Sequence, residues 1–217
     1  MTEVIQDEVK KMSALQQEIL EMLRLVQAMF TACFNGFIEN DIDILKHVPA
    51  GELKVTKIYN SLTASAVELA KENLSAQAQN IVVELVDCIC SAERIGDCCA
   101  DLAERIEYKI VEGLLFSETA VQEYRDLHGQ VQQILLDTIK AMQTHDQKVA
   151  EKCVKSKFVI DKLVDQYRAS HIERSAKGIC DEWAKVRYLD MLDSTKEVAQ
   201  HCIEIAEKKG LYQAPGL

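Results

Sequence analysis

The chain has 217 residues, 48% of them hydrophobic, and a formal net charge of −10 at pH 7. This hydrophobic content is too high for a disordered chain, and the acidity argues against a nucleic-acid partner and disfavours adsorption to anionic lipid. With only 8 Gly and 2 Pro, the composition predicts an all-α protein.

The first long helix has a heptad-like pattern. Apolar residues recur at alternating steps of three and four over residues 3–39, which is typical of a helix packed along one side. Pro49 and Gly51 interrupt the next helical region. We therefore expect a short helix over 42–47 and a longer one from about 50 to 73.

Serine and glycine signals delimit the third and fourth long helices. Ser75 is a suitable N-cap, and Gly113 can end the helix that it begins. Ser117 can cap the next helix, whose apolar pattern continues until His145. Two helices of more than 25 residues are expected here, joined by a short connection.

Two further helices complete the chain. The fifth is predicted over 147–172, and the sixth begins between Ala176 and Asp181. Gly210 stands in the C-cap position of the sixth helix, and residues 211–217 are expected to fray.

Six long helices with short connections predict an antiparallel bundle. A sequence frame of cysteine, acid, apolar residue, alanine and glutamate occurs at 99–104 and again at 202–207, late in the third and the sixth helix. The simplest interpretation is a tandem duplication, with an N-terminal three-helix unit over 1–113 and a C-terminal one over 114–217.

The location of the protein is predicted from two absences in the sequence. No apolar run reaches the roughly 20 residues that a membrane-spanning helix needs, and residues 1–11 lack the order of a secretion signal. We expect a cytoplasmic protein, on the periphery of a membrane complex at most. Its cysteines are then small core residues, since their spacing does not match a zinc motif.

The most informative motif is an acidic stripe on the third helix. Residues three and four apart share a helix face, so Glu93, Asp97, Asp101 and Glu104 lie on one side. Such a stripe is either a solvated helix face or, with a partner, a cation site. Cys90 lies on the same face and is a further candidate ligand.

The run Glu93-Arg94-Ile95-Gly96-Asp97, late in the third helix of a duplicated three-helix unit, resembles the PhoU family of phosphate-uptake regulators. The chain is also similar to the PhoU-like domain found with sodium/phosphate cotransporters. Residues 52–59 and 157–163 occupy the places where family members carry an acidic motif on the second helix of each unit. The resemblance implies a PhoU-like all-α fold over the whole chain.

In the PhoU family, acidic residues of the second and third helices bind clusters of iron or zinc. The resemblance therefore implies a metal site in the N-terminal unit whose ligands are Glu52, Glu93, Asp97 and Asp101. Thr56 replaces the second acid of its motif, so we expect a weak or mononuclear site for iron, zinc or another divalent cation.

The second site is predicted to be degenerate. Only Asp161 remains acidic there, whereas Lys157, Lys196 and Gln200 occupy the other positions. Two ammonium groups would repel a divalent cation, and one of them could pair with Asp161 instead. We expect no metal in the C-terminal unit.

Other chemical signatures are few. No histidine follows an acid by three residues, which argues against a ferritin-like di-iron centre, and we find no nucleophile motif or phosphate loop. Trp183 is predicted to be a core or interface anchor. A group of lysines is either a solvated face or a docking site for an acidic partner or phosphate: Lys152, Lys155, Lys157 and Lys162.

The sequence therefore supports two hypotheses of different classes. The first is a PhoU-like regulator of phosphate transport that catalyses nothing and docks on a phosphate transporter or a sensor kinase. The second is a metal-dependent or metal-storing helical bundle, with a degenerate scaffold as the remaining alternative. The long apolar patterns allow a homodimer, but the bundle itself could equally use all of them.

Overall fold

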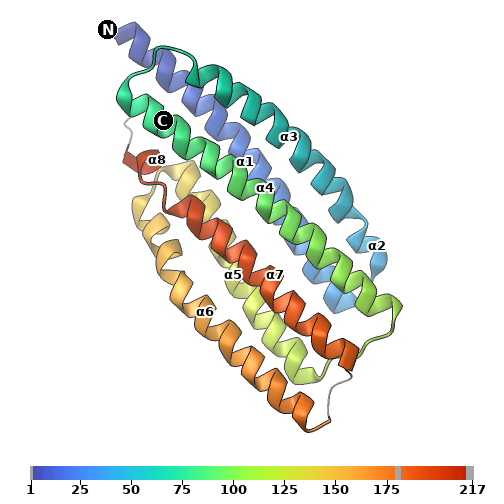
Figure 1. Cartoon of the computed structure of the whole chain (residues 1–217). Helices are drawn as coiled ribbons and strands as arrows, with labels where there is room; N and C mark the ends of the chain where they lie inside the picture. The colour runs from blue at the N-terminus through green and yellow to red at the C-terminus, as the bar shows by residue number, and fades with distance from the viewer. Residues whose placement is uncertain (1, 179–181, 214–217) are drawn as a thin grey trace.

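The computed structural model describes residues 2–178 and 182–213. Figure 1 shows an elongated bundle of long helices that run back and forth along one axis. The helices are α1 (Thr2–Glu39), α2 (Ile42–Leu45), α3 (His47–Ala70), α4 (Ala76–Val111), α5 (Glu118–Thr144), α6 (Gln147–Ala176), α7 (Glu182–Ala206) and α8 (Gly210–Gln213). Within the described residues no strand is present, which confirms the predicted all-α class.

The helices pack in the spatial order α3, α4, α7, α6. Helix α1 packs against α3 and α4, and α5 packs against α6 and α7. The contact between the two halves of the chain is made mainly by α4 on α7, with α1 on α5 beside it. This arrangement leaves α3 and α6 at opposite edges of the bundle (Figure 1).

The first helix of each half ends in the same way. Asn40 and His145 both adopt a left-handed backbone conformation, each with φ of 52°. The next residue in each case is an aspartate whose side chain caps the following helix, Asp41 for α2 and Asp146 for α6. These matched ends support the proposed tandem duplication, while the boundary between 113 and 114 stays a prediction.

Serine and glycine act at the other helix ends as expected. The Oγ atoms of Ser75 and Ser117 accept hydrogen bonds from the N–H groups of Ala78 and Ala120, each at 3.2 Å. Gly113, with φ of 62°, lies just beyond α4, where a left-handed residue closes the helix.

Two predicted helix boundaries are wrong. Pro49 does not interrupt the second helix, since it lies in the first turn of α3, where its missing N–H would have no helical partner. Gly210 is not the C-cap of the sixth helix, because α7 ends at Ala206 and Gly210 begins α8. The predicted start of the sixth helix falls partly on residues 179–181, outside the described residues.

The predicted frayed tail is also corrected in part. Leu211 is fully buried, and its N–H donates to Glu84 Oε2 at 3.2 Å, so α8 is held against α4. The carbonyl of Leu211 also lies 3.1 Å from Nδ1 of His145. Residues 214–217 lie outside the described residues.

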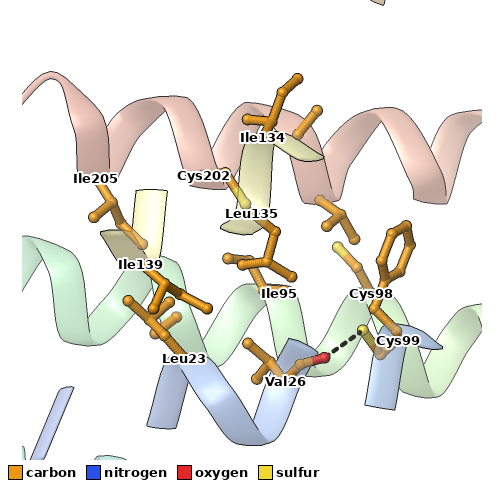
Figure 2. Packing of buried hydrophobic residues seen from close by; sticks show 14 of the residues in the cluster. Leu23, Val26, Ile95, Cys98, Cys99, Ile134, Leu135, Ile139, Cys202 and Ile205 are labelled. Atoms are coloured by element: carbon orange, nitrogen blue, oxygen red, sulfur yellow. Dashed lines mark hydrogen bonds between the residues drawn. The ribbon is translucent and has the colours of Figure 1, made fainter. Parts of the chain in front are cut away.

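A single hydrophobic core joins the two halves. Figure 2 shows residues from α1, α4, α5 and α7 meeting in its centre, among them Val26, Cys99 and Cys202. The Sγ of Cys33 donates to the carbonyl of Cys99 at 3.3 Å, and the hydroxyl of Thr138 donates to the carbonyl of Cys202 at 3.3 Å. The repeated frame thus receives the same kind of hydrogen bond in each half.

Candidate functional site

The candidate site lies where α3 packs closely on α4. Gly96 makes this packing possible, because a Cβ at this position would lie 3.0 Å from Cγ1 of Val55 and 3.6 Å from Cγ1 of Val26. Gly51 has a similar role between α3 and α1, since its Cβ would lie 2.7 Å from Met29 Cγ. Gly51 directly precedes the predicted ligand Glu52, and Gly96 lies between the predicted ligands Glu93 and Asp97.

The close packing brings carboxylates of both helices into mutual repulsion. Partial burial raises the pKa of Asp97, and the charges of Glu52 and Asp101 raise it further. The pKa of Glu93 is likewise raised, first by partial burial and then by Asp97, with an opposing effect of Arg94 and a further contribution of Glu52. The four predicted ligands therefore belong to one electrostatic cluster.

Glu52 is held within its own helix. The hydroxyl of Thr56 lies 3.0 Å from Glu52 Oε1 and 3.1 Å from the carbonyl oxygen of Glu52, so it can donate to either. The resemblance to the PhoU family implies a second acid at the position that Thr56 occupies. The neutral hydroxyl of Thr56 therefore replaces the second carboxylate of the motif, and it restrains the first, that of Glu52, by a hydrogen bond.

Asp101 has a cationic neighbour of its own. Its Oδ2 lies 3.5 Å from Nη1 of Arg105, which also donates to the Asp101 carbonyl at 2.7 Å. The pair lines a cavity of about 230 Å³ between α4 and α7, together with Glu104, Tyr108 and Arg187. Among the described residues, Asp101 is thus the one of these three acids with an ion pair, since neither Glu93 nor Asp97 forms one there.

The residues do not fit a preformed metal site in this arrangement. Over residues 2–178 and 182–213, no three His, Cys, Asp or Glu side chains are placed so that they could hold a metal ion. The carboxylates of Glu52, Glu93 and Asp97 interact through their charges but would have to reorient to share one cation. Metal binding by the N-terminal unit, with or without Cys90, stays a prediction.

The second predicted site contains an ion pair. Nζ of Lys196 on α7 lies 2.6 Å from Oδ1 of Asp161 on α6. Lys157 and Gln200, at the other two positions, are exposed. The pair is the salt bridge that the sequence suggested for this place, and it joins the two helices that a metal would otherwise bridge.

Six of the cysteines in the described part of the chain are buried core residues, whereas Cys90 is half-buried. Burial raises the pKa of Cys33 to about 12, and burial together with Glu197 raises that of Cys98 to about 12. Cys99, Cys153 and Cys202 are also buried and have raised pKa values. Because the thiolate is the nucleophile, these groups are poorly suited to covalent chemistry.

A polar cluster in the C-terminal half was not predicted from the sequence. The carboxylate of Glu123 on α5 accepts hydrogen bonds from Arg174 at 2.6 and 2.9 Å, from Ser170 at 2.6 Å and from Tyr188 at 2.8 Å. This cluster ties α5, α6 and α7 together. Helical periodicity does not reveal it, because the four residues come from three helices.

The prediction for Trp183 is wrong in its first alternative. The side chain is 64% exposed at the start of α7, so Trp183 is not a core residue. A role at an interface stays a prediction. The apolar exposure of Phe158, at 74%, was not predicted either.

Comparison with known proteins agrees with the predicted family. The family model described as the PhoU domain matches residues 19–106. The chain is 19% identical over 200 residues to the phosphate-specific transport system accessory protein PhoU homolog 1 of Thermotoga maritima, and the match covers 92% of this chain and 85% of the relative.

Solved PhoU structures share the fold. PhoU from Pseudomonas aeruginosa superposes with a TM-score of 0.85 at 18% identity, over 92% of this chain and 95% of that chain. The phosphate transport system regulatory protein PhoU from Streptococcus pneumoniae gives a TM-score of 0.83 at 15% identity, over 94% and 95% of the two chains. The predicted resemblance to the PhoU family and the PhoU-like helical fold are confirmed.

Proposed function

Starting from the place of this chain in the PhoU family, we propose that it regulates phosphate transport as a protein-interaction module. The observation that carries the proposal is the match to a transport-system accessory protein over 92% of the chain, combined with the PhoU domain at 19–106. Its partner is a component of a phosphate transporter or a sensor kinase.

A non-catalytic role agrees with the chemistry of the side chains. The buried thiols have raised pKa values, and the carboxylate of Glu123 accepts hydrogen bonds from Arg174, Ser170 and Tyr188 that join three helices. Catalysis would need a nucleophile or base beside a cavity that can admit a substrate. Glu123 lines an open pocket with Asp126 and Tyr167, but its carboxylate already accepts hydrogen bonds from Arg174, Ser170 and Tyr188.

A strain that lacks the gene for this protein tests the proposal. Phosphate uptake and the expression of a phosphate-starvation reporter are measured in phosphate-rich medium. Loss of a negative regulator should raise reporter expression, and the wild-type gene should restore repression. Affinity purification from phosphate-replete cells should recover a transporter or kinase component. Unchanged reporter expression and uptake in the deletion strain would contradict the proposal.

We further propose a weak divalent-cation site at Glu52, Glu93, Asp97 and Asp101, where the like charges favour any cation that can enter. Iron or zinc is the expected metal, and oxygen ligands would also accept other divalent ions. Elemental analysis after incubation with each metal tests the site. Glu93→Ala and Asp97→Ala should abolish retention, whereas Lys196→Ala should not change it.

Equal metal content in the wild type and in both carboxylate variants would exclude this site. The same result would remove the alternative of a metal-dependent or metal-storing bundle, because that hypothesis uses the same ligands. The regulatory proposal does not depend on the outcome, since deletion and docking are measured without reference to metal.

A further inference from the structure

The outer face of α6 carries a row of lysines. Four lysines and one valine are separated by alternating steps of four and three residues, so they lie on one face of the helix. We call them the basic stripe: Lys148, Lys152, Lys155, Val159 and Lys162. At 1.5 Å per residue the stripe is about 21 Å long.

The basic stripe faces away from the bundle. The buried residues of α6 lie on the opposite side of the helix and are Ala150, Cys153, Ile160, Val164, Tyr167 and His171. The four lysines are exposed, and α6 lies at the edge of the bundle (Figure 1). The stripe is therefore available to a flat surface.

Most of the positive charge in the basic stripe is not neutralised. Lys152 pairs with Asp137 of α5 at 2.7 Å. Within the described residues, Lys148, Lys155 and Lys162 have no ion-pair partner. Glu151 and Asp165 are the exposed acids nearest to the stripe on α6.

Apolar side chains interrupt the row of lysines. Phe158 is 74% exposed and lies next to Val159, which is 51% exposed. Two neighbouring exposed apolar residues are unfavourable in water, and on a basic helix face they are typical of segments that lie in the lipid–water interface. The lysine stems add apolar length beside them.

We propose that the basic stripe adsorbs this protein to an anionic membrane surface, with Phe158 and Val159 entering the headgroup region. Four lysines on one helix face are the pattern by which a polybasic segment binds anionic lipid. A specific protein interface would be richer in arginine, since lysine is depleted at such interfaces. The inference rests on the proposed function for its setting, because a regulator of a transporter works at the membrane.

The acidic stripe of α4 lies too far from the basic stripe to neutralise it. The acidic stripe of α4 is separated from α6 by α7, and packed helices lie about 8–10 Å apart. It is therefore roughly two Debye lengths from the basic stripe at physiological ionic strength. The expectation from composition treated the charge as evenly spread, whereas the structure places the acidic stripe and the basic stripe on helices that α7 separates.

Cosedimentation with vesicles tests the proposal. The purified full chain should sediment with vesicles of phosphatidylcholine and phosphatidylglycerol at a 7:3 ratio and should not sediment with pure phosphatidylcholine. The double variant Lys155→Glu/Lys162→Glu should lose at least tenfold in partitioning. Phe158→Ser should also weaken binding, which separates interfacial insertion from charge attraction alone.

The chain supplies a matched control on the opposite edge. Lys54 and Lys57 of α3 are also exposed, but no lysine row continues from them. Lys54→Glu/Lys57→Glu should reduce partitioning by less than threefold. Thermal unfolding of all variants should match the wild type, because every substituted side chain is exposed.

Two outcomes would overturn the proposal. The first is no sedimentation of the wild type with anionic vesicles, which would leave an acidic protein as the occupant of the basic stripe. The second is equal loss in the α6 and α3 variants, which would show diffuse attraction. Neither outcome bears on the reporter assay, so failure of this inference and failure of the proposed function are distinguishable.

Discussion

Lys196 and Asp161 bridge α7 and α6 at the place where the PhoU resemblance puts a metal, with Nζ 2.6 Å from Oδ1. The corresponding place in the N-terminal half holds Glu93, Asp97 and Glu52, which repel one another. The same helix contact thus differs between the two halves: an ion pair joins the helices in the C-terminal half, whereas carboxylates that repel one another lie there in the N-terminal half.

The Lys196–Asp161 pair is expected to contribute little to stability. Both side chains are partly exposed, so Lys196→Ala should lower the free energy of unfolding by less than about 1 kcal/mol. Chemical denaturation at low and high salt measures the effect, which should shrink with salt. Lys155→Ala is the control, and an equal loss there would show that the pair itself contributes nothing.

Gly96→Ala should destabilise the protein by about 1–3 kcal/mol, because the new methyl group overlaps Val55 and pushes α3 away from α4. Alanine has the higher helix propensity, so the steric effect must exceed a gain of about 1 kcal/mol. Denaturant unfolding measures the result, and Gly96→Ala/Val55→Ala should recover part of the loss.

Gly129→Ala is the matched control for Gly96. Gly129 lies in α5, and a Cβ there would meet no atom within 4 Å. This variant should be stabilised by about 0.5–1 kcal/mol through helix propensity alone. Stabilisation of both glycine variants would mean that Gly96 does not set the distance between α3 and α4.

Asp97→Asn should stabilise the folded chain at pH 7. The pKa of Asp97 is raised by partial burial and by Glu52 and Asp101, so the folded state binds this proton more readily than the unfolded state. Stability from this group therefore increases as the pH falls through the raised pKa and is absent at neutral pH. The gain in melting temperature of Asp97→Asn over the wild type should be largest at pH 7 and should shrink as the pH falls through the raised pKa of Asp97.

The exposed carboxylate of Asp165 on α6 serves as the comparison for Asp97. Asp165→Asn should change the melting temperature at pH 7 by less than Asp97→Asn does, because the Asp165 side chain is exposed. If Asp97→Asn instead lowers the melting temperature at pH 7, the carboxylate has a favourable partner, and the repulsive cluster described above is refuted.

Glu123→Gln should cost about 2 kcal/mol at pH 7, because Arg174 would keep its charge in a site where both partners are 11% exposed. Burial alone would raise the pKa of Glu123, but hydrogen bonds from Arg174, Ser170 and Tyr188 outweigh it and lower the pKa. The stabilisation is thus complete at neutral pH and is lost as the pH falls below about 4.5.

Urea denaturation between pH 3 and pH 7 measures this loss. The difference in stability between wild type and Glu123→Gln should shrink towards the acid end. Glu173→Gln is the control, since Glu173 forms an exposed pair with Lys177 and should change stability only slightly. A difference that stays constant with pH would contradict the role given to the carboxylate.

The helices were predictable because their signals are local. Ser75, Ser117 and Gly113 stand at the helix ends that their chemistry favours, and the periodicity of α1 follows from one buried side. Pro49 was misread, because a proline that breaks a helix interior is harmless in a first turn. Gly210 was misread, because it begins the short helix α8 instead of ending a helix. The N–H of Leu211 in α8 donates to Glu84 of α4, which is distant in sequence.

The candidate site was predictable only as a set of residues. Sequence spacing placed Glu93, Asp97 and Asp101 on one face, and the family resemblance added Glu52. Neither the spacing nor the resemblance predicted the hydrogen bond from Thr56 to Glu52 or the ion pair between Arg105 and Asp101. Such pairings depend on side-chain orientation, which helical periodicity does not determine.

The shared core has a consequence for any attempt to divide this chain. Val26, Ile95, Leu135 and Cys202 meet at the centre, so each half alone would expose the apolar surface that the other covers (Figure 2). Two fragments produced by a cut between α4 and α5 should aggregate separately and reassemble when mixed. The two halves are thus expected to behave as two subunits that are stable only together, held by the core that they share.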